Sequence, residues 1–291
     1  MHMNEIFNNN GYGYVDLGLP SKTLWATCNI GADKPSDFGL YFQWGDTVGY
    51  AKDQIGKDKQ FNGANYKWNP SGDGKTFTKY NKTDNKNVLD LEDDAANANM
   101  GGSWHMPTPT QIQELINETT SDWAKIDNVN GRLFTSKKDS SKSIFIPATG
   151  DVWEGSVYGI GSYGGVWSSM LSEYYVSYGQ YLYFYLNYIS LGGYGRFRGR
   201  SVRGVLDKSL GHKHFEPFQK VLIKEWFNSK SLWIPALYSY YNAENNRHYV
   251  IGGKWAKNEH IIPYEGNEYK VGKSEKKIID AIRMANDICT I

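Results

Sequence analysis

The residues with the clearest chemical character in this chain are tyrosines gathered in one stretch. Residues 171–198 hold eight of the 22 tyrosines, with several Ser and Gly, and contain no Lys, Asp, Thr, Ala, Trp or Met. A tyrosine side chain offers a large, stiff, half-polar contact area, and Ser and Gly add adaptable hydrogen bonding. This mixture is typical of antibody-like contact loops. The chemistry it predicts is recognition of a ligand, not catalysis.

The order of residues 181–186 adds a structural prediction. Tyrosines occupy the odd positions, and Leu182, Phe184 and Leu186 occupy the even ones. Because side chains alternate across a strand, one face would be apolar and the other would carry tyrosines. A tyrosine-rich core strand is the alternative; we expect an exposed face whose three tyrosines can become serine without loss of the fold. The candidate ligand-contact residues are Ser172, Tyr174, Tyr175, Ser177, Tyr178, Gly179, Tyr181, Tyr183, Tyr185, Asn187, Tyr188, Ser190, Tyr194, Phe197 and Arg198.

Metal chemistry has two candidate locations. A group of carboxylates could ligate calcium, because hard cations prefer clustered oxygen ligands. Their spacing is not that of an EF-hand loop, and carboxylates at the start of a helix also serve as caps. His212 and His214 lie in a linker without cysteine support, so solvated histidines are the simpler interpretation. We therefore expect no metal or cofactor; the calcium alternative uses Asp90, Glu92, Asp93 and Asp94.

Catalytic motifs are weak, and we expect no catalytic residue and no enzyme. Residues 159–164 match GxGxxG, but a dinucleotide site needs a helix after the glycines, and a strand is expected here. Histidine is scarce before residue 206, which disfavours a hydrolase triad. The two cysteines, Cys28 and Cys289, form no CxxC pair and no disulfide framework.

Length and charge set broader limits. The chain has 291 residues, which suggests about two domains, and its 32 basic and 31 acidic residues give a net charge of +1. This small net charge gives the chain no overall electrostatic attraction to nucleic acid or to an anionic membrane. We see no signal peptide and no apolar run of about 18 residues that would span a membrane. The expected locations are a phage virion, a cell surface reached by a non-standard route, or the cytoplasm.

The elements that would position the tyrosines are strands, loops and one well-marked helix. Thr108 is suited to cap this helix, Pro109 to begin it, and Gln111 to complete a capping box. Its apolar stripe is Ile112, Leu115 and Ile116. Residues 46–87 are rich in Lys, Asp, Asn and Gly and predict a long surface excursion. The other expected elements are strands at 14–16, 23–30, 40–44 and 143–148, and a short helix at 91–99.

Composition changes near residue 206, where a second domain is expected to begin. Strand patterns follow at 220–225, 232–241 and 249–252, and a helix is expected at 274–288, with Cys289 beyond it as an inert thiol. We expect an α+β chain with a flexible arm at 1–13, a main domain at 14–206, a linker at 207–214 and a small β-barrel-like domain with a C-terminal helix at 215–291.

Several blocks of the main domain resemble a known family. They are YVDLGLPSKTLWATCNIGA (14–32), YFQWGD (41–46), LDLEDDAANANMGGSWHMPT (89–108), SIFIPATG (143–150), WSS (167–169) and RGRSVRGV (198–205). They are similar to a domain abundant in gut Bacteroidetes, including Bacteroides, and in their phages. The resemblance implies a C-type-lectin-like fold with much irregular loop structure, of the formylglycine-generating-enzyme-like group. His105 departs from the family pattern, where arginine is expected, and this change would alter an internal ion pair.

A subset of such domains are variable proteins of diversity-generating retroelements, in which a reverse transcriptase miscopies template adenines. Randomised Asn codons yield Tyr, Ser, Gly, Phe, Leu, Ile, Val or Arg, and never Lys, Glu, Gln, Trp or Met. Residues 171–198 fit this set except for Glu173 and Gln180, which would be fixed positions. The resemblance thus implies a variable region at about 166–205, with Leu182, Phe184 and Arg196 as invariant scaffold residues.

The function implied is ligand or receptor binding by a hypervariable surface, as in a phage tail-tip protein or a bacterial adhesin. The partner would be a bacterial cell-surface protein or glycan, and a homo-oligomer is compatible with this function. One alternative is a formylglycine-generating-type oxidoreductase, which Cys28 standing alone in a strand disfavours.

Residues 215–273 resemble a recurring module of gut bacteria and their phages. Its basic and aromatic residues suggest a second alternative, stacking on single-stranded nucleic acid. A small core with solvated lysines is the favoured interpretation, so nucleic acid is not an expected partner. The residues concerned are Lys224, Trp226, Lys254, Trp255 and Lys257.

Overall fold

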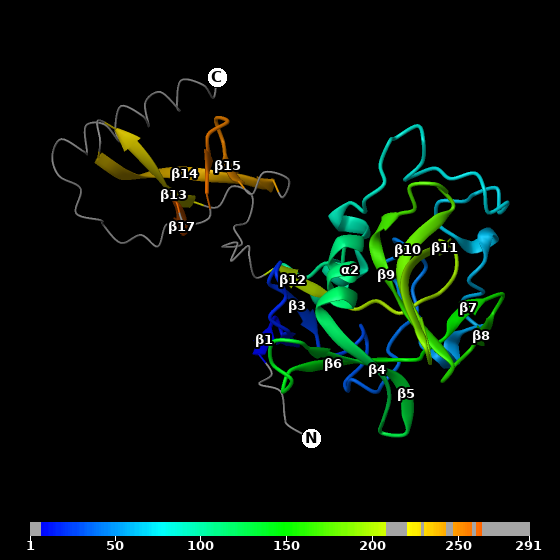
Figure 1. Cartoon of the computed structure of the whole chain (residues 1–291). Helices are drawn as coiled ribbons and strands as arrows, with labels where there is room; N and C mark the ends of the chain where they lie inside the picture. Colours follow the sequence, from blue (N-terminus) through cyan, green and yellow to red (C-terminus); the bar gives the residue numbers. More distant parts are fainter. Residues whose placement is uncertain (1–6, 208–219, 228–229, 243–246, 258–259, 264–291) are drawn as a thin grey trace. The chain divides into compact units, whose positions relative to one another are not determined.

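The computed structural model describes residues 7–207, 220–227, 230–242, 247–257 and 260–263. The chain divides into two compact units, 1–208 and 209–291. The described part is mostly β, with a few short helices and several small antiparallel sheets (Figure 1). Of the described helices, none has the length and apolar character needed to span a membrane.

The N-terminal sheet joins the beginning and the end of the first unit. Its strand order is β1-β2-β3-β12, with β1 at Phe7–Asn9, β2 at Tyr12–Asp16, β3 at Thr23–Ala26 and β12 at Val205–Asp207. Residues 7–13, expected in a flexible arm, therefore belong to strands and to the turn between them. Buried Arg203 ties the sheet to its surroundings by donating to the carbonyl oxygens of Ala26 and Phe145, each at 3.0 Å.

The helix predicted from its capping residues is confirmed. Helix α2 spans Pro109–Glu118, the Thr108 hydroxyl accepts from the Gln111 amide, and the Gln111 side chain completes the capping box. Ile112 and Leu115 are fully buried. Upstream, the expected short helix is divided between a 3-10 turn, η3 at Leu91–Asp93, and α1 at Ala95–Met100.

A second sheet contains a hairpin that periodicity did not reveal. Its order is β4-β5-β6, with β4 at Thr119–Ile126, β5 at Val129–Ser136 and β6 at Ser143–Pro147. Asp127 and Asn128 connect β4 and β5 with φ values of 47° and 67°. Positive φ at both central residues is the requirement of a tight hairpin turn, and Asp and Asn tolerate it. The Asp-Asn pair is the signal that could have located this hairpin.

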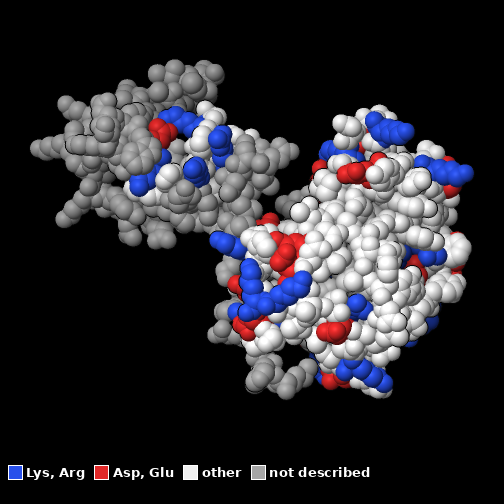
Figure 2. Space-filling view, viewed as in Figure 1, with Lys and Arg blue, Asp and Glu red and all other residues white. Residues whose placement is uncertain are grey.

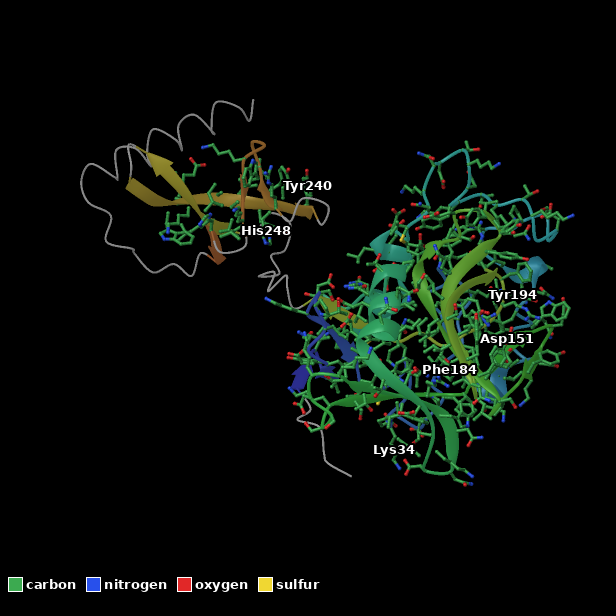
Figure 3. All side chains as sticks on the ribbon, viewed as in Figure 1. Lys34, Asp151, Phe184, Tyr194, Tyr240 and His248 are labelled. Atoms are coloured by element: carbon green, nitrogen blue, oxygen red, sulfur yellow. The ribbon has the colours of Figure 1, made fainter. Side chains whose placement is uncertain are left out.

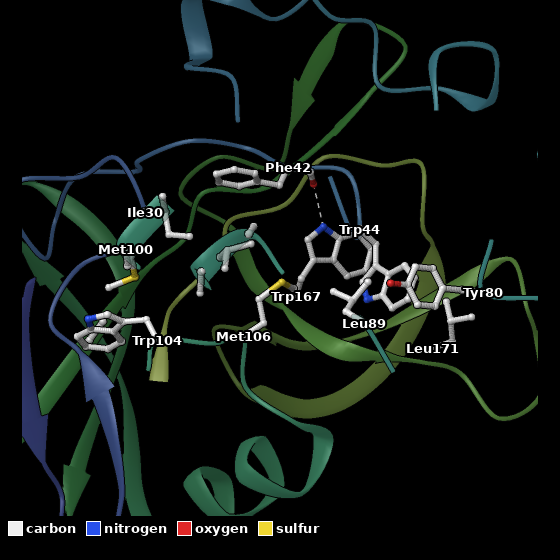
Figure 4. Packing of buried hydrophobic residues seen from close by; sticks show 14 of the residues in the cluster. Ile30, Phe42, Trp44, Tyr80, Leu89, Met100, Trp104, Met106, Trp167 and Leu171 are labelled. Atoms are coloured by element: carbon white, nitrogen blue, oxygen red, sulfur yellow. Dashed lines mark hydrogen bonds between the residues drawn. The ribbon is translucent and has the colours of Figure 1, made fainter. Parts of the chain in front are cut away.

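Residues 46–87 differ from the predicted surface excursion. Their regular structure is limited to two 3-10 turns, η1 at Lys52–Gln54 and η2 at Gly63–Asn65. Four of their aromatic side chains, however, are buried in the main hydrophobic cluster of the first unit: Tyr66, Trp68, Phe77 and Tyr80. In this cluster the Tyr80 ring lies 5.3 Å from that of Trp44 (Figure 4). Residues 40–44 make isolated bridges instead of a full strand, and the Phe42 carbonyl accepts from the Trp167 indole at 2.8 Å. The side chains of this segment therefore fill part of the core, although its backbone is irregular.

The remaining strands of the first unit carry the candidate site. A hairpin joins β7 at Asp151–Trp153 to β8 at Ser156–Tyr158. The third sheet has the order β11-β10-β9, with β9 at Tyr163–Leu171, β10 at Tyr178–Tyr185 and β11 at Tyr188–Gly195. Helix α2 contacts all three of these strands (Figure 1). The sheet therefore has one face covered by α2 and one face turned away from it.

The second unit is one antiparallel sheet in its described residues. The order is β16-β15-β14-β13-β17, with β13 at Lys220–Phe227, β14 at Lys230–Asn242, β15 at Arg247–Val250, β16 at Trp255–Ala256 and β17 at Ile261–Pro263. Among these strands β16 and β17 are edges, so the expected barrel closure is not found in the part that the structure describes. The expected helix at 274–288, His212, His214 and Cys289 lie outside the described residues.

Candidate functional site

The alternating segment forms β10 as its pattern predicts. Leu182 and Phe184 are fully buried and share a hydrophobic cluster with Ile112 and Leu115 of α2. Across the sheet, Tyr181 pairs with Gly192 and Tyr183 with Ser190. Because adjacent residues of a strand point to opposite faces, the tyrosines lie on the face away from α2. Leu186 is the exception: it is exposed, because it lies in the turn that follows β10.

The tyrosines of this segment lie at the surface of the first unit. None of the eight is buried, and Tyr174 and Tyr175 are 85% and 61% exposed. Tyr185, Tyr188 and Tyr194 are exposed, and the other three are half-buried. This placement disfavours the interpretation as a tyrosine-rich core strand. We call these eight side chains the tyrosine face: Tyr174, Tyr175, Tyr178, Tyr181, Tyr183, Tyr185, Tyr188 and Tyr194.

Ring contacts organise the tyrosine face into two rows. In the first row, the ring centres are 5.3 Å apart for Tyr175 and Tyr178 and 5.9 Å apart for Tyr178 and Tyr194. In the second row, the Tyr183 ring lies 5.5 Å from Tyr181 and 5.6 Å from Tyr188. Aromatic rings with centres about 4.5–7 Å apart attract one another, so each row holds its members in place.

One arginine, Arg200, connects the two rows, and a second, Arg198, connects Tyr194 to Trp153. The Arg200 guanidinium lies 3.9 Å from the centre of the Tyr181 ring and 5.6 Å from that of Tyr194. Arg198 lies between the rings of Tyr194, at 4.7 Å, and Trp153, at 4.8 Å. A guanidinium held over a ring face is attracted by the ring quadrupole. The arginines thus position rings that belong to different strands.

Asp151, labelled in Figure 3, lies at the start of β7 and pairs with both arginines. Its carboxylate is buried and lies 2.5 Å from the nearer Arg198 nitrogen and 3.4 Å from that of Arg200. The Tyr163 hydroxyl donates to the same carboxylate, and burial followed by this bond raises the pKa of Tyr163. Asp151 therefore sits at the centre of a buried ionic cluster beneath the tyrosine face.

The hairpin β7–β8 adds two aromatic residues that sequence reasoning missed. Trp153 and Tyr158 are exposed, at 41% and 48%. Glu154 and Gly155 between the strands have φ values of 47° and 72°, as a tight hairpin turn requires. The dipeptide Glu-Gly flanked by Val, Trp and Tyr was the available signal. Trp153 meets the tyrosine face through Arg198, outside the predicted variable region.

Some predicted contact residues belong to the framework instead. Gly179 is buried, and a side chain there would meet Trp44 at 2.7 Å and Trp167 at 3.1 Å, so Gly179 offers no contact surface. Tyr181 and Phe197 are half-buried and pack against the main hydrophobic cluster. Serine at Tyr181 is therefore expected to destabilise the fold more than serine at Tyr183 or Tyr185. The remaining predicted residues are exposed at Asn187 and half-buried at Ser172, Ser177, Ser190 and Arg198.

The site is nearly free of net charge. Arg196 is fully buried, Arg198 is paired with Asp151, and Glu173 is exposed. The Tyr183 hydroxyl donates to that of Tyr188, and this bond raises the pKa of Tyr183 to about 12. Figure 2 accordingly shows few charged side chains over β9–β11. Contacts to this face would depend on rings, hydroxyls and backbone, and only weakly on salt.

The carboxylates considered for calcium already surround a lysine. The Lys79 ammonium lies 2.9 Å from Asp90, 3.0 Å from Glu92 and 2.5 Å from Asp93. Burial alone would lower the pKa of Lys79, but these hydrogen bonds raise it. Asp94 points elsewhere, accepting from the backbone amides of Ala96 and Asn97 as the cap of α1. Clustered oxygen atoms that could ligate calcium are present, but the ammonium already takes the position between them.

His105, where the resemblance predicted arginine, forms an internal ion pair. Its Nε2 lies 3.2 Å from a carboxylate oxygen of Asp207. Burial would lower the pKa of His105, but the hydrogen bond and charge of Asp207 raise it above its ordinary 6.5. The pair is therefore strongest below pH 6.5, and its contribution is lost as pH rises through the raised pKa.

We expect His105→Gln to destabilise the protein more at low pH than at high pH. Because the pair is partly exposed, its loss should lower the melting temperature by about 2–4 °C at about pH 5.5 and by less at about pH 8.5. Thermal unfolding at the two pH values measures this difference. His105→Arg, whose charge does not titrate, is the control and should show no such pH dependence. An equal effect of His105→Gln at both values would contradict the assignment.

The cysteine of the first unit, Cys28, lies near the Thr27 hydroxyl and the charge of Arg203. Cys28 is half-buried, and its thiol lies 3.5 Å from the Thr27 hydroxyl. The glycine loop at 159–164 leads into the strand β9, so the helix that a dinucleotide site needs after the glycines does not follow it. Comparison with family models, curated proteins and solved structures finds no match for this chain.

Proposed function

We propose that this chain is a non-enzymatic ligand-binding protein with a C-type-lectin-like first domain. In this proposal the tyrosine face is its variable surface, diversified by a retroelement, and Trp153 is a constant member at its margin. The ligand is a bacterial cell-surface protein or glycan, met by a phage tail tip or by a bacterial adhesin.

The observation that carries this proposal is the separation of displayed and supporting side chains within one segment. Leu182, Phe184 and Arg196, which this proposal takes as invariant scaffold residues, are fully buried. The tyrosines interleaved with them reach the surface. Mutagenesis at a variable position then changes the ligand contact while leaving the packed side of the strand untouched.

The free energies of folding and of binding respond very differently to substitutions on such a surface. Surface substitutions usually change stability by less than about 0.5 kcal/mol. A buried aromatic anchor in an interface, in contrast, contributes about 2 kcal/mol or more to binding. Tyrosines suit this task because two χ angles fix a large contact area. Diversity on the tyrosine face is therefore nearly neutral for the fold and decisive for recognition.

Contacts from other parts of the first unit hold both ends of β10 in place. Arg132 of β5 donates from one nitrogen to the carbonyl oxygens of Tyr185 and Leu186, at 3.0 and 2.9 Å. These bonds hold the turn between β10 and β11. At the other end of the sheet, Gly179 lies against Trp44 and Trp167. Both ends of the displayed strand are fixed by residues that the proposed variation would leave unchanged.

Sequencing the gene and its flanking DNA tests the proposal. We expect a near-copy of the region encoding residues 166–205 that keeps adenines where the gene has other bases, with a reverse-transcriptase gene nearby. Genes from independent isolates should differ mainly at exposed positions of residues 172–198 and should keep Leu182, Phe184 and Arg196. Absence of a near-copy, with substitutions spread evenly over residues 14–206, would contradict the proposal.

A further inference from the structure

The second unit carries a row of aromatic side chains across three neighbouring strands. Tyr240 pairs with Tyr249, and Tyr249 pairs with Trp255, so the three residues lie side by side on one face of the sheet. The rings of Tyr240 and Tyr249 are parallel within 5°, with centres 4.9 Å apart. Tyr240 and Trp255 are exposed, at 52% and 44%. We call these three residues the aromatic row.

The aromatic row lies on the face opposite the core of this unit. Tyr238, Val250 and Ala256 are buried on the core side, together with Ile234. A β-bulge between Tyr238 and Tyr240 places these two tyrosines on opposite faces. The ring of Tyr240 is thus directed away from the core by the backbone, and the row is a surface feature.

One basic side chain lies on the row, and a second lies against another aromatic ring of the same sheet. The Arg247 guanidinium lies 3.6 Å from the centre of the Trp255 ring, and the Lys224 ammonium lies 5.9 Å from that of Trp233. Among the described residues of this unit the one acidic residue is Glu225, which is paired with Lys254 at 2.8 Å. Figure 2 shows Lys and Arg side chains predominating on its described surface. The complementary partner is an anion.

We infer that this face binds single-stranded nucleic acid. Exposed rings in a basic setting stack on bases of any sequence, while arginine and lysine neutralise phosphates. A duplex would present phosphates but no base faces to the rings. An acidic protein would satisfy the charges but would leave the row without a flat partner. The sequence alone favoured solvated lysines, because the three aromatic residues are separated along the chain and only the strand register unites them.

The inference is tested with the full chain and a fluorescein-labelled thymidine oligonucleotide, followed by fluorescence anisotropy. We expect binding at low salt that weakens steeply between about 50 and 200 mM salt. Tyr240→Ser combined with Trp255→Ser should weaken binding about tenfold or more, because each stacked base contributes strongly. Arg247→Gln should weaken binding and lower the slope of log affinity against log salt by about 0.7.

A matched control separates this face from the tyrosine face. Tyr183→Ser combined with Tyr188→Ser, in the first unit, should leave oligonucleotide affinity unchanged. Circular dichroism and thermal unfolding of each variant show whether the fold is kept, and Arg247→Gln tests the inference even if the double variant unfolds. The inference is overturned if the wild-type chain does not bind, if the tyrosine-face variant loses binding, or if polyglutamate competes as well as the oligonucleotide.

Discussion

Replacing Arg196 by leucine should lower the melting temperature of the first unit by about 10 °C or more. The Arg196 guanidinium is fully buried and lies 3.5 Å from the centre of the Phe77 ring. It donates to the carbonyl oxygens of Tyr80, at 2.9 Å, and Lys79, at 3.1 Å. Leucine would leave both carbonyls unpaired, and each hydrogen bond from a charged donor contributes about 1.5–3 kcal/mol.

The reason for so large an effect is the position of Arg196 in the chain. Arg196 directly follows β11 and connects the strands of the tyrosine face to residues 46–87. The backbone of residues 46–87 is irregular, so few strand or helix hydrogen bonds hold it in place. Thermal unfolding measures the change, and Lys82→Leu, which removes a charge from an exposed residue, is the control. A shift below about 3 °C for Arg196→Leu would mean that the two segments are held together by other contacts.

Asp151→Ala is the second substitution with a large expected effect. Removing one partner of a buried ionic cluster costs about 3–5 kcal/mol, because the remaining charge stays buried and unpaired. Here that charge is Arg200, whose side chain is 3% exposed. We expect a fall in melting temperature of about 10 °C. Asp139→Ala, on an exposed loop, should change it by no more than about 2 °C.

Asp151→Ala should also disturb the tyrosine face, which a purely local loss of stability would not do. Arg198 and Arg200 lie under the rings of Tyr194 and Tyr181, and both would lose their anchor. Near-ultraviolet circular dichroism, measured well below the melting temperature, reports the packing of these rings. A destabilised variant with an unchanged spectrum would show that Asp151 supports the fold and does not position the tyrosines.

Local signals predicted part of this architecture well. The capping residues Thr108 and Gln111 located α2, because a capping box depends on residues three positions apart. Alternation in residues 181–185 identified which side chains of β10 are buried, because the period of a strand is local as well. Both predictions needed no knowledge of distant parts of the chain.

Long-range packing explains what the sequence did not reveal. Residues 46–87 have the composition of a surface loop, yet Phe61, Tyr66 and Tyr80 are buried against segments far along the chain. Tyr181 and Tyr183 are alike in the alternating pattern, but Tyr181 alone of the two lies against Trp167, at 5.6 Å. Trp153 joins the site only through Arg198. Such differences depend on tertiary neighbours, which composition and spacing do not specify.

The thermal stability of a tyrosine-to-serine variant tests most directly whether the displayed rings are dispensable for folding. We would replace Tyr174, Tyr185 and Tyr188 together and compare the variant with one carrying serine at the buried Tyr41, Tyr66 and Tyr80. We expect a melting temperature within about 3 °C of the wild type for the first variant and loss of cooperative unfolding for the second. Loss of folding in the first variant would show that the fold depends on these exposed rings, contrary to this expectation.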